Sequence, residues 1–331
     1  MAKKMSAAEI VADSRKKLVE EIIENMKKGY IFPPNKWNND MFRPQNPISG
    51  ARYKGVNKFR LTLAASIMKY DDPRWLTLNQ VKKTEGLEFK SYDRNKGVLC
   101  EKWIFERKVK EKDPQTGVEE EKIVKLSRPV VNYFTLYNAQ EIEGLPELSR
   151  KTLEYDETMK ICDEFMKSSI CPITETTEGR AYYRPSTDEI VMPMRDSFRD
   201  SESFFSTVLH EMGHSTGHPM RLNRDQSGGF GSESYAREEL RAELSSYFTE
   251  ADLGIDLGKH GLHHHVMYLE SWVGALQNDV NELFEAIRDA DKSTEFLIDR
   301  YEQYKERVVE KEAIQENRDE LEKVEYDDFE R

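Results

Sequence analysis

Apolar residues recur at helical spacing in several stretches of the chain, separated by polar segments. This spacing predicts an amphipathic helix over residues 6–29 that stops at Gly29. Residues 31–57 contain four prolines and five asparagines, which predicts a loop. Further helices are expected near residues 59–69 and directly after Pro73. The start of the chain is therefore expected to be helical with one long irregular connection.

Strand character follows in the next part of the chain. Residues 98–107 and 121–137 are rich in β-branched and aromatic side chains, and an Asp-Pro-Gln-Thr-Gly turn lies between them. These strands and the preceding helices predict a first domain of mixed α+β structure over residues 1–150.

The second half is predicted to be mainly helical with a small sheet. The expected elements, in order, are a helix over 155–168, a hairpin of 181–184 and 189–193 with its turn at 185–188, a helix around residue 210, a Gly/Ser-rich loop over 226–234, a helix up to Gly254 and a helical segment over 263–299. The fold class is thus α+β with two domains, the second over residues 151–299, and residues 300–331 are expected to form a charged helix or tail.

The composition indicates the cellular compartment and the kind of partner to expect. No run of 18 apolar residues and no apolar block near the start are present, so neither a membrane span nor a signal peptide is expected. The three cysteines are widely spaced, which predicts free thiols and a cytoplasmic protein. The formal net charge is −12, yet residues 36–103 hold 14 Lys and Arg against 7 Asp and Glu. An anionic partner is therefore expected for the first half alone.

A histidine pair in the second half points to a metal. His210 and His214 are four residues apart, so on a helix their Cβ atoms lie roughly 5–6 Å apart and both imidazoles can face one cation. Glu211 is turned about 100° away, where it can act as the catalytic general base toward a metal-bound water. Asp200 or Ser201 is expected to cap this helix.

Catalytic zinc takes three protein ligands, and three groups of residues compete for the third position. His218 continues the spacing, but Gly217 and Pro219 should break the helix, and the tract 263–265 is expected to be exposed. On the helix that follows, Glu239 is predicted to be the ligand, with Glu243 orienting a ligating histidine. Glu238 is expected to point the other way with Ser245.

The stretch HEMGHSTGHPMRLNRD resembles the signature of the ArdC-type antirestriction proteins of plasmids and phages. AYYRPSTDEIVMPMRDSF, SYAREELRAELSSYF and SWVGALQNDVNELFEA resemble that family in order and spacing. RYKGVN, DDPRWLTLNQVKK and YFTLYNAQEIEGLPE are similar to its single-stranded-DNA-binding domain, which TraC-type conjugative primases share. One departure is FKSYDRNKG, which stands where the family has a KGEKG-like stretch. The resemblance implies a zincin-like metallopeptidase domain with Zn²⁺, a DNA-binding first half and protection of incoming DNA.

Cations interleaved with aromatic side chains suit single-stranded DNA, because cations meet phosphates and aromatic rings stack on bases. The residues predicted to bind DNA are Arg52, Tyr53, Lys54, Lys58, Arg74 and Trp75.

The sequence therefore predicts an antirestriction protein of a mobile element or phage. Its partners are expected to be single-stranded DNA and a host restriction enzyme or peptide substrate, with no membrane. Two alternatives stay open at this point. One is a cytosolic zinc protease whose first half binds a protein, and the other is a DNA-replication accessory protein with a structural metal.

Overall fold

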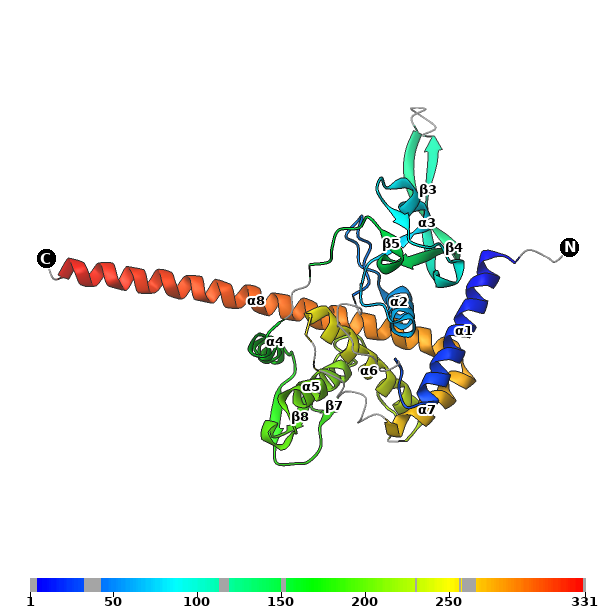
Figure 1. The fold of residues 1–331 in the computed structure, drawn as a ribbon. Coiled ribbons are helices and arrows are strands. Elements are labelled where there is room, and N and C mark those ends of the chain that lie inside the picture. The colour runs from blue at the N-terminus through cyan, green and yellow to red at the C-terminus, as the bar shows by residue number, and fades with distance from the viewer. Residues whose placement is uncertain are drawn as a thin grey trace. The chain divides into compact units, whose positions relative to one another are not determined.

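The computed structural model describes residues 5–32, 43–112, 119–149, 153–229, 231–255, 257 and 266–329. It has the predicted α+β fold and two compact units (Figure 1). The first unit comprises residues 1–150 together with 266–287, and the second comprises residues 151–265 together with 288–331. Within the described residues, no helix is long and apolar enough to cross a membrane.

The first unit begins with helix α1 (Ala7–Lys27), as the sequence predicted. Ser6 caps it, because the Ser6 hydroxyl accepts a hydrogen bond from the Glu9 amide while the Glu9 carboxylate accepts one from the Ser6 amide. The helix stops at Lys28, and Gly29 follows with a φ of 93° that favours glycine. Its apolar stripe is buried, including Ile22 at the centre.

Two boundaries in the next segment differ from the prediction. Helix α2 (Gly55–Met68) begins four residues earlier than residue 59. The helix expected directly after Pro73 is shorter, because Trp75–Thr77 forms strand β1 and α3 (Leu78–Lys83) starts only afterwards. Trp75 pairs with Asn138 across the sheet, and this long-range pairing outweighs the local helical pattern.

The two long strands are confirmed as an antiparallel pair. Strands β3 (Val98–Lys112) and β4 (Glu119–Asn138) are neighbours, and β1 adds to β4 to give the order β1-β4-β3. The predicted turn over 113–117 lies outside the described residues. Strands β2 (Glu88–Phe89) and β5 (Ile142–Glu143) form a small second sheet. One face of the larger sheet is buried against α2, through residues that include Leu61, Ala65, Trp75, Cys100 and Leu136.

The predicted helical segment 263–299 is divided in two. Helix α7 (Val266–Asn278) belongs to the first unit, and α8 (Asn281–Phe329) starts in that unit and continues in the second. The break falls at Asp279, whose side chain accepts a hydrogen bond from the Asn281 amide and so begins a new helix. Residues 300–329, expected to be a helix or tail, are helical.

The second unit opens with α4 (Tyr155–Lys167) and a three-stranded sheet. Strands β7 (Tyr182–Arg184) and β8 (Glu189–Pro193) form the predicted hairpin, with Asp188 in the left-handed region at a φ of 52°. Strand β6 (Ile173–Thr176), which the sequence did not reveal, pairs parallel with β8. Four residues with no local turn partner give little pattern from which to predict such a strand.

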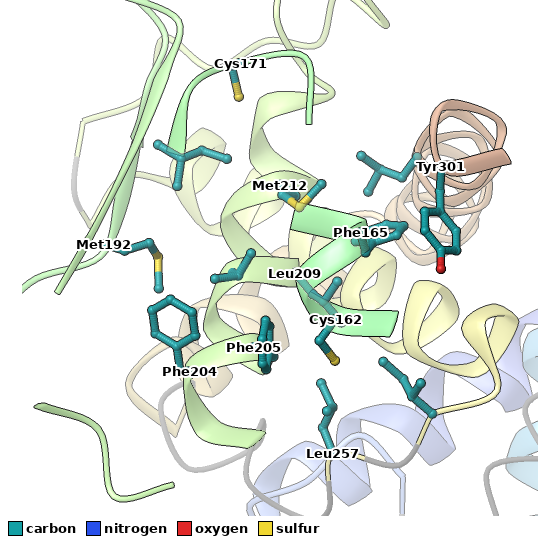
Figure 2. Close-up of a cluster of buried hydrophobic side chains, with 14 residues drawn as sticks. Cys162, Phe165, Cys171, Met192, Phe204, Phe205, Leu209, Met212, Leu257 and Tyr301 are labelled. Carbon is teal, nitrogen blue, oxygen red and sulfur yellow. The ribbon is translucent and has the colours of Figure 1, made fainter. Parts of the chain in front are cut away.

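Two helices then carry the residues of interest. Helix α5 (Ser201–Ser215) is capped by Asp200, whose carboxylate accepts a hydrogen bond from the Ser203 amide at 2.8 Å. Helix α6 (Glu233–Leu253) ends at Gly254, which has a φ of 70°. Figure 2 shows the apolar side of α5, where Phe204, Phe205, Leu209 and Met212 pack in the core. That packing leaves the opposite side of α5 for the histidines.

Candidate metal centre

Helices α5 and α6 approach closely because small residues line their contact. A Cβ atom added to Gly213 would lie 3.2 Å from the Ala242 carbonyl oxygen and 3.3 Å from the Ala242 Cα. Ala242 is fully buried, as expected for a small residue that lets a second helix come near. This contact places the His210–His214 side of α5 against the carboxylates of α6.

The structure brings His210, His214 and Glu239 together. The two Nε2 atoms are 3.1 Å apart, and on the Glu239 carboxylate Oε2 lies 3.4 Å from Nε2 of His210 while Oε1 lies 3.4 Å from Nε2 of His214. Tetrahedral zinc with ligand bonds of about 2.1 Å separates its ligand atoms by roughly 3.4 Å. These three residues also form a group of possible metal ligands within 4.8 Å of one another. The donor atoms and their spacing therefore fit one metal ion.

The other nitrogen of each imidazole faces a second carboxylate. Glu243 lies 3.4 Å from Nδ1 of His210, and Glu238 lies 3.2 Å from Nδ1 of His214. An ionised carboxylate only accepts hydrogen bonds, so when a metal takes Nε2 each imidazole would keep its remaining proton on Nδ1, facing Glu243 or Glu238. Glu243 thus occupies the position that the sequence predicted for it, beside a histidine.

The position of Glu238 corrects the sequence analysis, which had it pointing away with Ser245. Glu238 is buried, and its carboxylate contacts His214 as well as Arg224 and Gln226. Consecutive residues of a helix differ in direction by about 100°, so Glu238 and Glu239 can address the same histidine from two sides. The apolar stripe alone did not show this, because α6 is buried on more than one side.

Arg224 reaches the centre because the chain turns back after α5. The amide of Arg224 donates to the Gly217 carbonyl at 2.9 Å, and Asn223 takes a φ of 50° in this reversal. The guanidinium then donates to both Glu238 oxygens, at 2.9 and 2.6 Å, and to the Gly213 carbonyl at 2.9 Å. Gly217 leaves the space, since a Cβ there would lie 2.7 Å from the Gln226 side chain. Sequence reasoning missed Arg224 and Gln226.

Opposing effects set the pKa values at the centre. Burial lowers the pKa of His214, but hydrogen bonds that its imidazole donates to Glu238 and Glu239 outweigh burial and raise that pKa to about 9. Burial likewise lowers the pKa of His210, but hydrogen bonds that its imidazole donates to Glu239 and Glu243 raise that pKa well above the usual value. Burial raises the pKa of Glu238, whereas Arg224 and His214 together bring it down to about 2. The Glu238 carboxylate is therefore ionised at neutral pH.

The remaining histidines stand apart from this group or outside the described residues. Nδ1 of His218 accepts a hydrogen bond from the Met220 amide at 3.2 Å, so His218 belongs to the turn. The tract 263–265 lies outside the described residues. Glu211 is buried in α5 directly after His210, and its charge contributes to raising the pKa of His210.

The residues predicted to bind DNA divide into two sets. Trp75 is fully buried under α2, and Lys58 is buried within α2. Neither side chain lies on the surface, where a DNA-binding residue was expected. Arg74 is held by Asp72 at 2.7 Å and by the Pro146 carbonyl at 2.6 Å. The burial of Trp75 and Lys58 counts against a role for these two side chains in DNA binding, whereas Arg74 is only partly buried and its assignment stays a prediction.

The other three predicted residues lie on one loop. Arg52 and Lys54 are exposed, whereas Tyr53 is partly buried and its hydroxyl donates to the Trp75 carbonyl at 3.3 Å. The loop is therefore a cationic surface with a tyrosine that is largely committed to the interior.

Both halves of the chain match known protein families. Residues 12–137 match the N-terminal domain of the anti-restriction factor ArdC, and residues 160–289 match a zincin-like metallopeptidase. The structure is similar to the metal-free antirestriction ArdC protein from the R388 plasmid, with a TM-score of 0.67 and 28% identity over 87% of this chain and 98% of that one. The chain belongs to the ArdC family.

Other members and relatives add to this placement. The Mn(II)-bound R388 ArdC structure is similar to the same degree, with a TM-score of 0.67, 27% identity, and 87% and 97% coverage of the two chains. The uncharacterized protein y4eC of Sinorhizobium fredii is 30% identical over 86% of this chain and 91% of its own length. The zincin-like match implies a metal, in agreement with the geometry of the centre.

Longer relatives contain the same region. Two DNA primases TraC of Escherichia coli are 36% and 35% identical over 88% and 85% of this chain. The chain spans only 27% and 19% of their lengths.

Proposed function

We propose that this ArdC-family protein is an antirestriction protein that binds single-stranded DNA and carries a zinc-dependent hydrolytic centre. The observation that carries the proposal is the convergence of two imidazole nitrogens and one carboxylate at 3.1–3.4 Å. Two histidines and a glutamate are the donor set of catalytic zinc in metallopeptidases, with the fourth position open.

His210, His214 and Glu239 would hold the metal. A zinc ion held there would supply Lewis-acid chemistry, activating water and polarising a substrate carbonyl. Glu238 and Glu243 keep the two imidazoles in the tautomer that presents Nε2. Glu211 lies next to His210 on α5 and accepts the proton that the attacking water gives up. A peptide bond is the substrate class that this arrangement suits.

DNA binding is assigned to the first unit. The region over residues 36–103 carries the excess of Lys and Arg in an otherwise acidic chain, and Arg52 and Lys54 are exposed within it. Cations on a surface loop neutralise phosphates without reading sequence, so a salt-dependent preference for single strands is expected.

This assignment gives the protein a biological setting. Incoming plasmid or phage DNA and the restriction enzymes that attack it meet in the cytoplasm of a bacterial cell. We therefore place the protein there, with single-stranded DNA and a host restriction enzyme or other polypeptide as its partners.

The ligand assignment is tested by the metal content of two matched variants. Zinc retained after dialysis is measured for the wild type, Glu239→Gln and Glu238→Gln. Glu239→Gln should lose the ion, because it removes a ligand. Glu238→Gln should keep the ion with lower affinity, because it removes only the support of His214.

Loss of zinc in Glu238→Gln together with retention in Glu239→Gln would overturn the assignment. Equal retention in both would place the metal elsewhere.

A further inference from the structure

Trp75 is buried and Tyr53 is partly buried, so neither aromatic residue predicted to stack on a base presents an open ring. Side chains alternate between the faces of a strand, so the face opposite the buried one carries Tyr133, Thr135 and Tyr137 of β4. Tyr133 stands opposite Glu101 of β3, and Thr135 stands opposite Leu99. We call this surface the Tyr133 face.

The Tyr133 face is covered at its two ends and open between them. At one end Tyr137 is buried beneath Phe89 and Tyr92, with ring centroids 5.1 and 5.7 Å away. At the other end Arg15 of α1 binds Glu101 at 3.0 Å and lies 5.2 Å from the centre of the Trp103 ring. Between these covers Tyr133 is 43% exposed, and Tyr92 is 52% exposed at the edge.

Tyr92 is held in place rather than loose on the surface. Its hydroxyl lies 3.1 Å from that of Tyr137, and its ring packs edge-on against Phe89 at 5.3 Å. Gly97 closes the loop over Tyr137, since a Cβ there would lie 2.4 Å from Thr135 and 3.0 Å from the Tyr137 ring. A fixed, half-exposed ring loses little conformational entropy when a base stacks on it.

The charge around this surface suits a polyanion. Lys90 and Arg94 flank Tyr92 and are exposed, whereas Asp93 is turned to the Asn95 amide at 2.8 Å. The one buried carboxylate of the face, Glu101, is neutralised by Arg15 through two-pronged contact. Tyr92, which packs on Tyr137 of this face, thus has exposed cations on both sides of it in the sequence, and rings suit bases as cations suit phosphates.

We propose that the Tyr133 face is the single-stranded-DNA platform, with Tyr92 and Tyr133 each stacking on a base and Lys90 and Arg94 meeting phosphates. The proposal rests on the proposed DNA-binding function and specifies which surface performs it. The ligand is single-stranded nucleic acid of any sequence, because stacking on a ring does not distinguish bases strongly.

The test is binding of a fluorescent oligothymidine to the full chain, followed by anisotropy at several salt concentrations. Tyr92→Ala and Tyr133→Ala should each weaken binding by roughly 5- to 150-fold, with the salt dependence unchanged. Tyr92→Phe and Tyr133→Phe keep the ring and should stay within about twofold of the wild type. Lys90→Gln should instead lower the slope of log affinity against log salt by roughly 0.7.

Tyr155→Ala is the matched control, because Tyr155 is 54% exposed on α4 in the second unit. If the wild type fails to bind the oligonucleotide, the proposed function itself falls. If the wild type binds and the alanine variants of Tyr92 and Tyr133 behave like Tyr155→Ala, the platform is elsewhere and this inference is overturned. Phenylalanine variants as weak as the alanine ones would also overturn it, since the ring would then not be the source of affinity.

Discussion

At the scale of single residues, the centre depends on side chains that do not touch the metal position. Arg224 donates to both oxygens of Glu238, and Glu238 in turn faces Nδ1 of His214. The same guanidinium also donates to Thr216 at 2.6 Å and to Ser293 at 2.8 Å. Arg224 therefore keeps the Glu238 carboxylate ionised and holds its orientation. Through Glu238 it also holds the orientation of the His214 ring.

Replacing Arg224 should weaken the metal site without removing a ligand. In Arg224→Met, a roughly 10- to 100-fold loss of zinc affinity is expected, because a partner of a ligating histidine is lost. The buried Glu238 charge is also left poorly paired, which should cost about 3–5 kcal/mol of folding free energy. Competition with a chelator and thermal unfolding measure the two effects.

The control for this change is Arg237→Met. Arg237 forms a partly exposed pair with Glu233 one turn away on the same helix, so little change is expected. Zinc affinity that is equal in Arg224→Met and Arg237→Met would show that Arg224 does not support the centre.

The raised pKa values of the histidines predict that metal and protons compete. Without metal, the protonated form of His214 stabilises the fold fully below about pH 6.5, and this contribution disappears as the pH rises through its folded pKa of about 9. Metal needs the deprotonated form, so the affinity for zinc should increase over the same range. The difference in melting temperature between zinc-loaded and chelator-treated protein should therefore be larger at pH 8.5 than at pH 6.5. A difference that does not change with pH would contradict these protonation states.

The sequence could predict those residues of the centre whose positions depend on neighbouring residues in the chain. His210 and His214 share one helix face by their spacing alone, and Asp200 caps that helix by a local contact. Glu239 could be chosen from the residues of the next helix. Arg224 could not, because its position depends on a chain reversal with a left-handed Asn223. Trp75 was misjudged because an aromatic residue beside a proline looks the same in a loop and in a core strand.

At the scale of elements, the contact between α5 and α6 determines whether the ligands from the two helices meet. Gly213 lies one residue before His214, and its nearest neighbours on α6 are backbone atoms of Ala242. Backbone atoms cannot rotate away as a side chain does, so any added volume must separate the helices. Helix ends such as Ser6, Asp200 and Gly254 were predictable or recognisable from sequence, since caps are local.

Gly213→Ala is expected to reverse the usual effect of this substitution. Alanine normally stabilises a helix interior by about 1 kcal/mol relative to glycine. Here the added Cβ lies at 3.2–3.4 Å from α6, so overpacking should destabilise the protein by about 1–3 kcal/mol and weaken zinc binding. Gly274→Ala on α7 is the control, because nothing lies within 4 Å of its added Cβ and it should stabilise. Thermal unfolding that shows a gain in both variants would exclude close packing at Gly213.

At the scale of the whole molecule, the chain does not divide at one point. Residues 266–287 belong to the first compact unit although they follow the metal-binding helices in sequence. Arg15 of α1 lies 4.3 Å from the centre of the Phe284 ring, and Trp272 of α7 is buried. A fragment ending at residue 150 would lose these contacts. The hydropathy pattern could not reveal that residues 266–287 join the first unit, because that pattern reports local structure and this is a long-range contact. The domain boundaries at residues 150 and 299 therefore stay predictions, and tests of function belong on the full chain.

Our central proposal is that this ArdC-family protein protects incoming DNA and that its proposed hydrolytic centre takes part in that protection. The most direct measurement is the transfer frequency of an unmodified plasmid into a restricting host that expresses the wild type or Glu211→Gln. Glu211→Gln keeps all three proposed ligands and the whole DNA-binding unit, so its zinc content and oligonucleotide affinity serve as controls. The account predicts that the wild type restores transfer and that Glu211→Gln does not. Equal protection by Glu211→Gln would contradict it and leave DNA binding as the source of protection.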